Sequence, residues 1–328
     1  MSSPVYNLCF LMDPYETLNL DTETSLLCMD ELIARGHRVF WLQQEDLSLE
    51  GNVVAGRVSR VCSTAPFKLE ESEARRLDEF DAVVIRKDPP FDETYLHLTY
   101  LLDFLPGTTT VVNSPAALRT FNEKLTTLIW PEACPETLVS MNIDQLAAFV
   151  RTHDRVVLKP LDNCSGREIA FIDASSSSLD EDLERYRNRS GTPQFVLAQK
   201  YLPGVARGDK RVYLVDGEPV GWVNRVPAEG SNLANIHQGA TCEPTSLTEQ
   251  ERRLSMAIGA RLKTEGILLA GLDFIDGKLT EINLTSPSAV RQINAVSGDH
   301  LEVRIVDAIL AMLCKRSNLD APQARQDR

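Results

Sequence analysis

The chain has 328 residues, enough for two or three domains, and its 43% hydrophobic and 25% charged residues are ordinary for a globular protein. A formal net charge of −13 argues against nucleic acid or an anionic membrane surface as the main partner. We expect no signal peptide and no membrane span, because the N-terminus lacks a basic flank and no apolar stretch reaches ~20 residues. The seven scattered cysteines lack metal-binding spacing and favour a reducing, cytoplasmic location.

The first part of the chain alternates predicted strands and helices. Strands are predicted at residues 5–12, 37–43, 80–86 and 109–113, and helices at residues 22–35, 94–104 and from Ser114 onward. Strand–helix–strand units are typical of a parallel sheet covered by helices. Ligands of such sheets bind beyond the carboxyl ends of the strands, where Asp13 and the polar residues 86–92 lie.

The rest of the chain changes character. Residues 156–160, 169–172 and 195–200 are predicted strands that form a small antiparallel α+β module with a helix at residues 179–186. The last part has predicted strands at residues 209–215, 219–226, 268–275 and 278–283, and helices at residues 248–265 and about 300–316. Thr248 and Glu251 form a capping-box pattern at the start of the first of these helices.

Residues 271–283 carry the clearest chemical signal. Asp276-Gly277 is a tight-turn pair that predicts a hairpin. Glu281 and Asn283 are two residues apart on one strand, so they point to the same face, and the hairpin brings Asp273 toward that face. Three hard oxygen ligands without sulfur or imidazole suit magnesium. An edge hairpin whose polar residues are merely solvated is the alternative interpretation.

Several short motifs accompany this hairpin in one fixed order. In addition to Glu281-Ile282-Asn283, they are Met12-Asp13-Pro14, residues 86–92, Asn122-Glu123-Lys124, residues 157–161, residues 199–202, Asp209-Lys210-Arg211 and Thr285-Ser286-Pro287. The ordered set resembles the bacterial glutathione synthetases of the ATP-grasp superfamily, from about Val5 to Cys314. The resemblance implies an α/β protein: an N-terminal parallel α/β domain (1–122) and a two-lobed α+β ATP-grasp module, made of a lid subdomain (123–201) and a C-terminal subdomain with the hairpin (202–328).

The resemblance also implies a reaction and a set of cofactors. ATP would phosphorylate a carboxylate, and an amine would then attack the acyl phosphate, which joins γ-glutamylcysteine to glycine. Asp273, Glu281 and Asn283 would hold magnesium, which manganese can replace, as two ions that bridge the ATP phosphates. Arg211 would stabilise the acyl phosphate and the tetrahedral intermediate, where a fixed guanidinium matches the oxyanions.

Further residues receive binding roles from the same resemblance. Lys124 and Lys159 would contact the phosphates, although a lysine in isolation is more often a surface charge. Asp209 would bond to the ribose, unless it is only a turn residue after Gly208. The adenine would be recognised by the segment Gln199, Lys200, Tyr201 and Leu202.

The peptide and amino-acid substrates are assigned to a second group of residues. Arg225 and Arg291 would bind substrate carboxylates by paired hydrogen bonds, and Ser286 would supply a hydroxyl donor. Asp13 and Arg86 would line the γ-glutamyl end, with an ion pair from Arg86 to Asp88 or Asp92 as the alternative. The family also implies a homodimer or homotetramer assembled through the N-terminal domain.

Two loops depart from the family pattern. The phosphate loop is Asp-Gly-Met-Gly-Gly in the family but residues 162–166 here, where only Gly166 remains of three glycines. The substrate loop at residues 227–240 is shorter and contains no arginine. His237 could replace one positive group when protonated, although an ordinary exposed loop histidine is the favoured interpretation. These loops motivate a second hypothesis, a related ATP-grasp ligase with different substrates. A nucleotide-binding protein without catalysis is a third hypothesis, against which the retained metal, lysine and arginine residues count.

Overall fold

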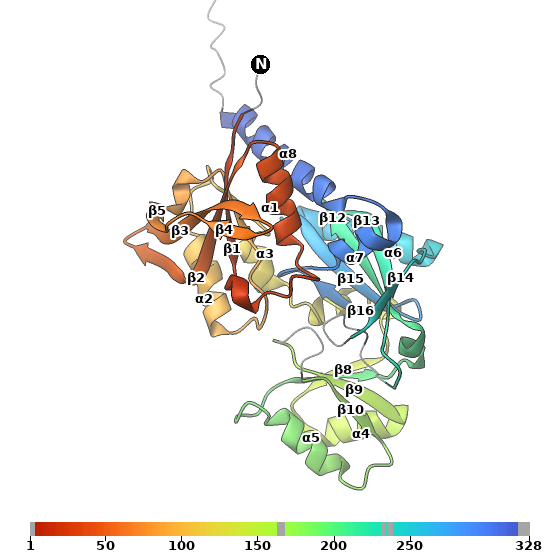
Figure 1. Ribbon diagram of the computed structural model, residues 1–328. Helices are drawn as coiled ribbons and strands as arrows, with labels where there is room; N and C mark the ends of the chain where they lie inside the picture. Colours follow the sequence, from red (N-terminus) through yellow and green to blue (C-terminus); the bar gives the residue numbers. More distant parts are fainter. Residues whose placement is uncertain (1–3, 163–167, 231–233, 235–238, 321–328) are drawn as a thin grey trace, which may run out of the picture.

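The computed structural model describes residues 4–162, 168–230, 234 and 239–320. Within these residues the chain forms three sheets (Figure 1). Two of them lie in the upper body of the molecule, and the third stands below in a separate lobe. The long C-terminal helix α8 (Leu301–Asp320) crosses the top of the body, where it joins the first sheet to the last.

The N-terminal sheet has a parallel centre and an antiparallel edge. The parallel strands are β1 (Asn7–Met12), β2 (Arg38–Glu50), β6 (Ala82–Ile85) and β7 (Thr110–Val112). The antiparallel strands are β3 (Val53–Thr64), β4 (Phe67–Leu69) and β5 (Glu73–Arg76). The predicted parallel sheet is therefore confirmed at its centre, and the β3–β5 extension was not predicted.

Strand β1 is apolar on both sides because helices cover both faces of its sheet. Phe10 packs in a core with α1 (Ser25–Ala34) and α8, whereas Leu11 packs in a core with α2 (Glu93–Leu102) and α3 (Pro115–Thr120). Both cores continue into the C-terminal sheet, through Tyr213 in the first and Phe274 in the second. The N-terminal domain and the C-terminal sheet are thus packed as one body.

The lower lobe has its own sheet and its own core. Its antiparallel strands are β8 (Thr137–Ser140), β9 (Arg155–Lys159), β10 (Ala170–Asp173) and β11 (Val196–Lys200), in the order β10-β9-β11-β8. Helices α4 (Ile143–His153) and α5 (Leu179–Arg187) pack on it, and Leu146, Leu158 and Leu183 lie in a core separate from the body. The antiparallel module was predicted, but β8 and α4 were not.

The C-terminal sheet brings the hairpin against two further strands. Its order is β14-β13-β12-β15-β16, with β12 (Asp209–Val215), β13 (Glu218–Val226), β14 (Thr241–Glu243), β15 (Leu269–Ile275) and β16 (Lys278–Asn283). Helix α6 (Glu249–Thr264) begins with the predicted capping box between Thr248 and Glu251, and α7 (Val290–Ser297) was not predicted. Short 3-10 helices occur at Tyr15–Thr17, Leu77–Glu79, Leu125–Ile129, Pro131–Ala133 and Pro203–Arg207.

The cysteines among the described residues are unpaired, and two of them belong to the packed core of the body. Cys9 in β1 and Cys28 in α1 are buried, and burial raises the pKa of both thiols. A thiol in such a setting is a poor nucleophile, which agrees with a reaction that needs no covalent catalysis. Among the described helices, none combines the length and the apolar character that crossing a bilayer requires.

Candidate active site

The hairpin predicted at residues 271–283 is formed by β15 and β16. Asp276 and Gly277 both have positive φ, as the tight two-residue turn requires. The register places Asp273 opposite Glu281 on one side and opposite Arg211 of β12 on the other. Side chains from three adjacent strands therefore meet at one point.

Asp273 is the centre of a buried charge cluster. Its carboxylate accepts two hydrogen bonds from Arg211, at 2.5 and 2.9 Å, one from Arg225 at 2.9 Å and one from Asn283 at 3.1 Å. The three charged side chains are each at most 6% exposed. Burial alone would raise the pKa of Asp273, but the two guanidinium groups outweigh it and hold the pKa well below its usual range.

Asp209 completes the cluster from the start of β12. Its Oδ2 lies 2.6 Å from a terminal nitrogen of Arg225, whereas Oδ1 is buried without a hydrogen-bond partner among the described residues. Burial raises the pKa of Asp209, and Arg225 opposes that shift. We call Asp209, Arg211, Arg225 and Asp273 the hairpin cluster. It contains two positive and two negative charges, so it is neutral as a whole.

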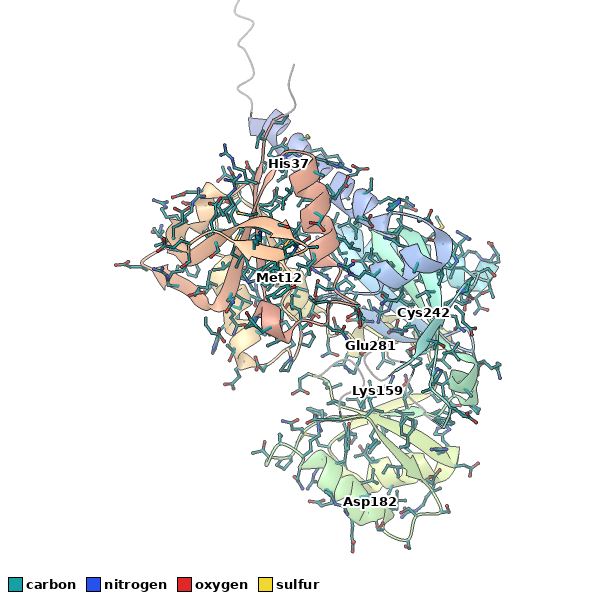
Figure 2. The ribbon with its side chains drawn as sticks, in the orientation of Figure 1. Met12, His37, Lys159, Asp182, Cys242 and Glu281 are labelled. Atoms are coloured by element: carbon teal, nitrogen blue, oxygen red, sulfur yellow. The ribbon has the colours of Figure 1, made fainter. Side chains whose placement is uncertain are left out.

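Two lysines approach Glu281 from different parts of the chain. Lys124 Nζ lies 3.3 Å from Glu281 Oε1, and Lys124 is only 4% exposed. Lys159 comes from β9 of the lower lobe, and its Nζ donates to Gln199 Oε1 at 2.9 Å. Burial lowers the pKa of Lys159, and Glu281 counteracts this. Figure 2 shows Lys159 below Glu281, where the lower lobe meets the body.

Glu123 organises this region, and the sequence analysis assigned it no role. Its backbone oxygen accepts from Ile282 N at 2.8 Å, beside the free edge of β16. Its Oε1 accepts from Leu284 N at 2.6 Å and from Thr285 N and Oγ1, both at 2.9 Å. Glu123 therefore fixes the chain on both sides of Asn283 and sets Lys124 beside Glu281. The only sequence signal was its place in the Asn122-Glu123-Lys124 motif.

The segment expected to bind adenine leaves β11 toward the body. Gln199 is buried and donates to Thr137 Oγ1 at 3.1 Å. The backbone nitrogens of Lys200 and Tyr201 already donate to Glu136 O and Arg155 O, at 2.9 and 3.1 Å. Adenine recognition would therefore use other backbone atoms of the segment, which continues to Leu202 and the following 3-10 helix.

The residues expected on the substrate side lie where the N-terminal domain meets the C-terminal sheet. Arg86 donates to Ser25 Oγ and to Pro287 O, both at 2.9 Å, rather than pairing with Asp92, which caps α2. A terminal guanidinium nitrogen of Arg86 is buried with no hydrogen-bond partner in the described part of the chain.

The remaining predicted substrate residues line the same junction. Arg291 donates to Glu23 O at 2.9 Å, and Ser286 hydrogen-bonds to Asp88. Asp13 accepts from Asp88 N at 2.8 Å. By contrast, Arg225 lies in the hairpin cluster, where its guanidinium is already bound to two aspartates. Gly166, Cys164 and His237 lie outside the described residues.

The donor set at the hairpin fits a hard divalent cation in its chemistry. Asp273, Glu281 and Asn283 offer two carboxylates and an amide oxygen, as magnesium and manganese prefer. The described residues contain no cluster of three or more His, Cys, Asp and Glu that could hold a metal, so the amide is an essential member of the set. Asp273 already accepts four hydrogen bonds, about the full capacity of a carboxylate. Metal binding at Asp273 therefore requires that it exchange at least one of them.

The chain is similar to proteins of one family over most of its length. Residues 6–119 match the family model described as prokaryotic glutathione synthetase, N-terminal domain, and residues 123–298 match its ATP-grasp domain. Glutathione synthetase of Vibrio cholerae is 36% identical over 310 residues, covering 92% of this chain and 96% of the relative. That of Pseudomonas aeruginosa is 35% identical over 315 residues, covering 94% and 99%.

Solved structures of lower identity share the fold. The D-cycloserine synthetase DcsG has a TM-score of 0.67 at 16% identity, covering 93% of this chain and 99% of its own. D-alanyl-alanine synthetase A from Vibrio cholerae has a TM-score of 0.62 at 14% identity, covering 96% and 99%. The predicted α/β architecture, with an N-terminal domain and an ATP-grasp module, is confirmed. The chain belongs to the prokaryotic glutathione synthetase family and is an ATP-dependent ligase of the ATP-grasp type.

Proposed function

We propose that this protein joins γ-glutamylcysteine to glycine while ATP is converted to ADP and phosphate. The observation that carries the proposal is the hairpin cluster, with Lys124 and Lys159 close to Glu281 beside it. A phosphoryl transfer to a carboxylate brings two anions together, so fixed cations must surround them. The chain supplies four such cations, Lys124, Lys159, Arg211 and Arg225, from four separate positions, which is more than a binding site for an uncharged ligand requires.

The phosphates of ATP are assigned to Lys124 and Lys159. Magnesium, or manganese, held by Asp273, Glu281 and Asn283 would supply charge neutralisation at the β- and γ-phosphates, and we propose two ions. The adenine is assigned to the backbone of residues 199–202 and the ribose to Asp209. Asp209 Oδ1 is a buried acceptor without a partner among the described residues, which supports a ligand hydroxyl there. Gly166 is assigned to the phosphate loop.

Arg211 is the proposed catalytic residue. Its guanidinium is held by Asp273 and by Ser288 O, the latter at 3.4 Å, so its position is fixed before substrates bind. In the first step a substrate carboxylate oxygen attacks the γ-phosphorus, and the bond to ADP breaks. In the second step the glycine amine attacks the acyl carbon, phosphate leaves and the nitrogen loses a proton. Negative charge grows on oxygen in both steps, and a preorganised guanidinium stabilises it.

The substrate carboxylates are assigned to Arg86, Arg225 and Arg291, with Ser286 and Asp13 as polar neighbours. Arg86 has the strongest support, because one of its buried nitrogens lacks a partner among the described residues. Arg225 has weaker support, since Asp209 and Asp273 already occupy its guanidinium.

The test is a coupled assay with purified protein. Phosphate release is followed with ATP, magnesium, γ-glutamylcysteine and glycine, and the tripeptide product is identified by mass spectrometry. Turnover that requires all four components supports the proposal. No phosphate release with this pair, together with turnover for another acyl donor or amine, would overturn it.

A related ligase with a different acyl donor or amine is the second candidate. It is favoured by the sequence of two loops, since residues 227–240 contain no arginine and residues 162–166 keep one glycine. Replacing glycine by a panel of amino acids and amines in the same assay separates the candidates. A kcat/KM for another amine at least tenfold above that for glycine would favour the second.

Three coarser features belong to the same proposal. We assign the domain limits to residues 122/123 and 201/202, and we propose a cytoplasmic homodimer or homotetramer. Free thiols in the body suit a reducing compartment. Light scattering of the purified protein measures the oligomeric state, and a monomer at assay concentration would contradict that part.

A further inference from the structure

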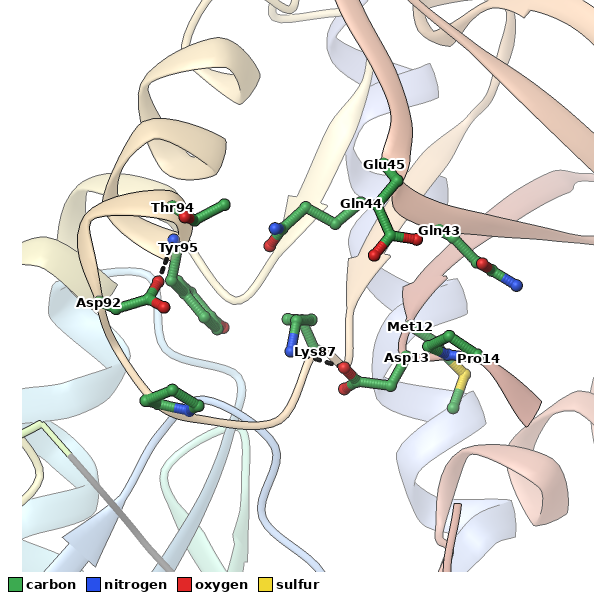
Figure 3. Close-up of a pocket in the computed structure, with 11 residues that line it drawn as sticks. Met12, Asp13, Pro14, Gln43, Gln44, Glu45, Lys87, Asp92, Thr94 and Tyr95 are labelled. Carbon is green, nitrogen blue, oxygen red and sulfur yellow. Dashed lines mark hydrogen bonds and ion pairs between the residues drawn. The ribbon is translucent and has the colours of Figure 1, made fainter. Parts of the chain in front are cut away.

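A polar cavity lies at the carboxyl ends of the N-terminal strands, outside the hairpin cluster. It has a volume of about 230 Å³ and lies between the ends of β1 and β6, the middle of β2 at residues 43–45 and the first turn of α2. Figure 3 shows the side chains of Asp13, Gln44, Glu45, Lys87 and Tyr95 around an open centre. We call this cavity the strand-end pocket. It has room for several water molecules or for the polar headgroup of a small ligand.

The charges around the strand-end pocket favour a ligand that carries an ammonium group. Asp13, Glu45 and Asp92 contribute three carboxylates, and Lys87 contributes one ammonium. Lys87 Nζ lies 2.5 Å from Asp13 Oδ1 and donates to Asp88 O at 3.0 Å, so it is fixed at the edge of the pocket. The excess of negative charge would repel a simple anion such as phosphate.

Two buried polar atoms in the lining have no hydrogen-bond partner in the described part of the chain. They are the hydroxyl oxygen of Tyr95 and the amide oxygen Oε1 of Gln44. Tyr95 is 1% exposed, its ring packs against Phe91 with 4.7 Å between centroids, and Figure 3 shows it reaching from α2 toward Lys87. Burial raises the pKa of the Tyr95 phenol, so the hydroxyl stays protonated and can donate.

These atoms define what a ligand must offer. Tyr95 needs an acceptor and reaches toward Lys87, whereas Gln44 Oε1 needs a donor and lies across the open centre from Lys87, with its side chain extended toward Thr94. A buried polar group without a partner is unfavourable, so the pocket is incomplete without an occupant. An α-amino acid carries the required pair, because its carboxylate accepts and its ammonium donates.

We propose that the strand-end pocket binds the ammonium and carboxylate of an α-amino acid, with Tyr95 and Lys87 toward the carboxylate and Gln44 and Glu45 toward the ammonium. The inference rests on the proposed function, because a γ-linked glutamate keeps both of these groups free. The γ-glutamyl end of the acyl donor is therefore the source we favour. A free amino acid acting as an effector has the same chemistry.

A series of neighbouring residues links the pocket to Arg211. Lys87 and Arg86 are consecutive at the end of β6, and Lys87 lines the pocket while Arg86 donates to Pro287 O. Ser288, the next residue after Pro287, accepts from Arg211 at 3.4 Å. A substrate whose head lies in the pocket would pass the unpartnered Arg86 nitrogen on its way to Arg211. This arrangement favours an extended acyl donor over a separate effector.

The test compares Tyr95→Phe with Tyr100→Phe in the full-length protein. Tyr95→Phe removes only the hydroxyl and keeps the ring against Phe91. Tyr100 lies on the same helix but is 49% exposed, so its variant controls for α2. Loss of one hydrogen bond to a charged group predicts a KM for γ-glutamylcysteine raised roughly 10- to 100-fold in Tyr95→Phe. The kcat and the KM values for ATP and glycine should not change.

Truncated acyl donors identify the group that Tyr95 contacts. Glutaryl-cysteine lacks the ammonium, and 4-aminobutanoyl-cysteine lacks the carboxylate. If Tyr95 contacts the carboxylate, Tyr95→Phe should raise the KM for glutaryl-cysteine by the same factor as the KM for γ-glutamylcysteine. The KM for 4-aminobutanoyl-cysteine should not change. Equal losses for all three donors would overturn the assignment of Tyr95 to the carboxylate.

Calorimetry with L-glutamine separates failure of the pocket from failure of the proposed function, because it needs no turnover. L-glutamine carries the same headgroup and a γ-amide. Binding to the wild type that Tyr95→Phe abolishes supports the pocket, even if γ-glutamylcysteine and glycine give no phosphate release. The same result with an unchanged KM for γ-glutamylcysteine would identify a free amino acid as the source. Unchanged KM together with L-glutamine binding that is absent or unaffected would mean that the pocket holds only water, and would overturn the inference.

Discussion

The hairpin cluster and the strand-end pocket lie at two ends of the same junction and differ in how their polar groups are satisfied. In the hairpin cluster, two arginines and two aspartates hold one another at 2.5 to 2.9 Å. In the pocket, Tyr95 and Gln44 each keep a buried polar atom without a partner among the described residues. The first arrangement holds its two guanidinium groups in place before any ligand arrives and leaves only Asp209 Oδ1 without a partner among the described residues, whereas the second has unpartnered atoms on two of its lining residues.

This difference assigns the reaction chemistry to the hairpin cluster and the selection of the substrate to the strand-end pocket. Charges that are already fixed need not reorient when negative charge grows on the reacting oxygens, which is how preorganised sites stabilise transition states. Groups that remain unsatisfied discriminate instead, because a ligand lacking the matching donor or acceptor leaves them buried and unpaired. The comparison predicts that changes in the cluster alter stability and kcat, whereas changes in the pocket alter KM.

The largest effect is expected when the cluster loses its central carboxylate. Asp273→Asn leaves Arg211 and Arg225 with one buried aspartate between them, and breaking a buried ion pair costs about 3–5 kcal/mol. Urea denaturation followed by circular dichroism measures this loss. Asp276→Asn is the matched control, since Asp276 lies in the exposed turn of the same hairpin and asparagine tolerates its positive φ. A loss below about 1 kcal/mol in Asp273→Asn would mean that the four charges do not act as a unit.

The next effect concerns turnover rather than stability. Glu281→Gln keeps the shape of the side chain but removes one of the proposed metal ligands and the partner of Lys124. We expect kcat to fall roughly 10²- to 10³-fold, the range for loss of one group that stabilises transition-state charge, while the thermal midpoint stays near that of the wild type. Glu243→Gln, an exposed residue on β14, controls for a lost charge. Normal magnesium-dependent turnover in Glu281→Gln would place the metal elsewhere.

The part of the site around the hairpin cluster could be predicted from the sequence where the residues that form it are close together in the chain. The Asp276-Gly277 turn and the spacing of Glu281 and Asn283 fix the hairpin within thirteen residues. The pairing of Asp273 with Arg211 and Arg225 depends on the register of β12, β13 and β15. The sequence of these three strands carries no local signal for that register. The sequence therefore identified the members of the site but not that two of them neutralise a third.

The elements and contacts that were not predicted have either a weak sequence pattern or partners that are far apart in the chain. Strands β3, β4 and β5 form an edge with many exposed residues, so they lack the apolar run that marks a buried strand. Strand β8 has four residues, too few for a periodic pattern. The contacts of Glu123 with Leu284 and Thr285 span about 160 positions of the chain, and only the folded arrangement of the sheets brings them together.

Glu123 allows an intermediate effect to be measured. Glu123→Leu removes the acceptor of two backbone amides, each of which costs about 1–3 kcal/mol when left unsatisfied. Since these amides flank Asn283, we expect apparent magnesium affinity to fall roughly 10- to 100-fold, the range for loss of a group that orients a metal ligand. Glu123→Gln keeps an oxygen acceptor and should restore most of the affinity. If both variants bound magnesium like the wild type, Glu123 would not position the hairpin.

The smallest effect is a change in pH dependence, which should arise at the cluster end and not at the pocket. Burial lowers the pKa of Lys159 from its ordinary value of 10.5. Lys159 attracts phosphate only when protonated, so ATP affinity should persist below its lowered pKa and decline as the pH rises through it. Lys159→Arg keeps its charge at alkaline pH and should extend the plateau, whereas Lys278→Arg on β16 should not. Calorimetric titration of ATP from neutral to alkaline pH measures both. Because Tyr95 remains protonated over this range, the KM for glutaryl-cysteine, which has no ammonium group to lose its proton, should stay constant at saturating ATP. An alkaline rise of this KM in parallel with the loss of ATP affinity would mean that the two ends are not chemically separate.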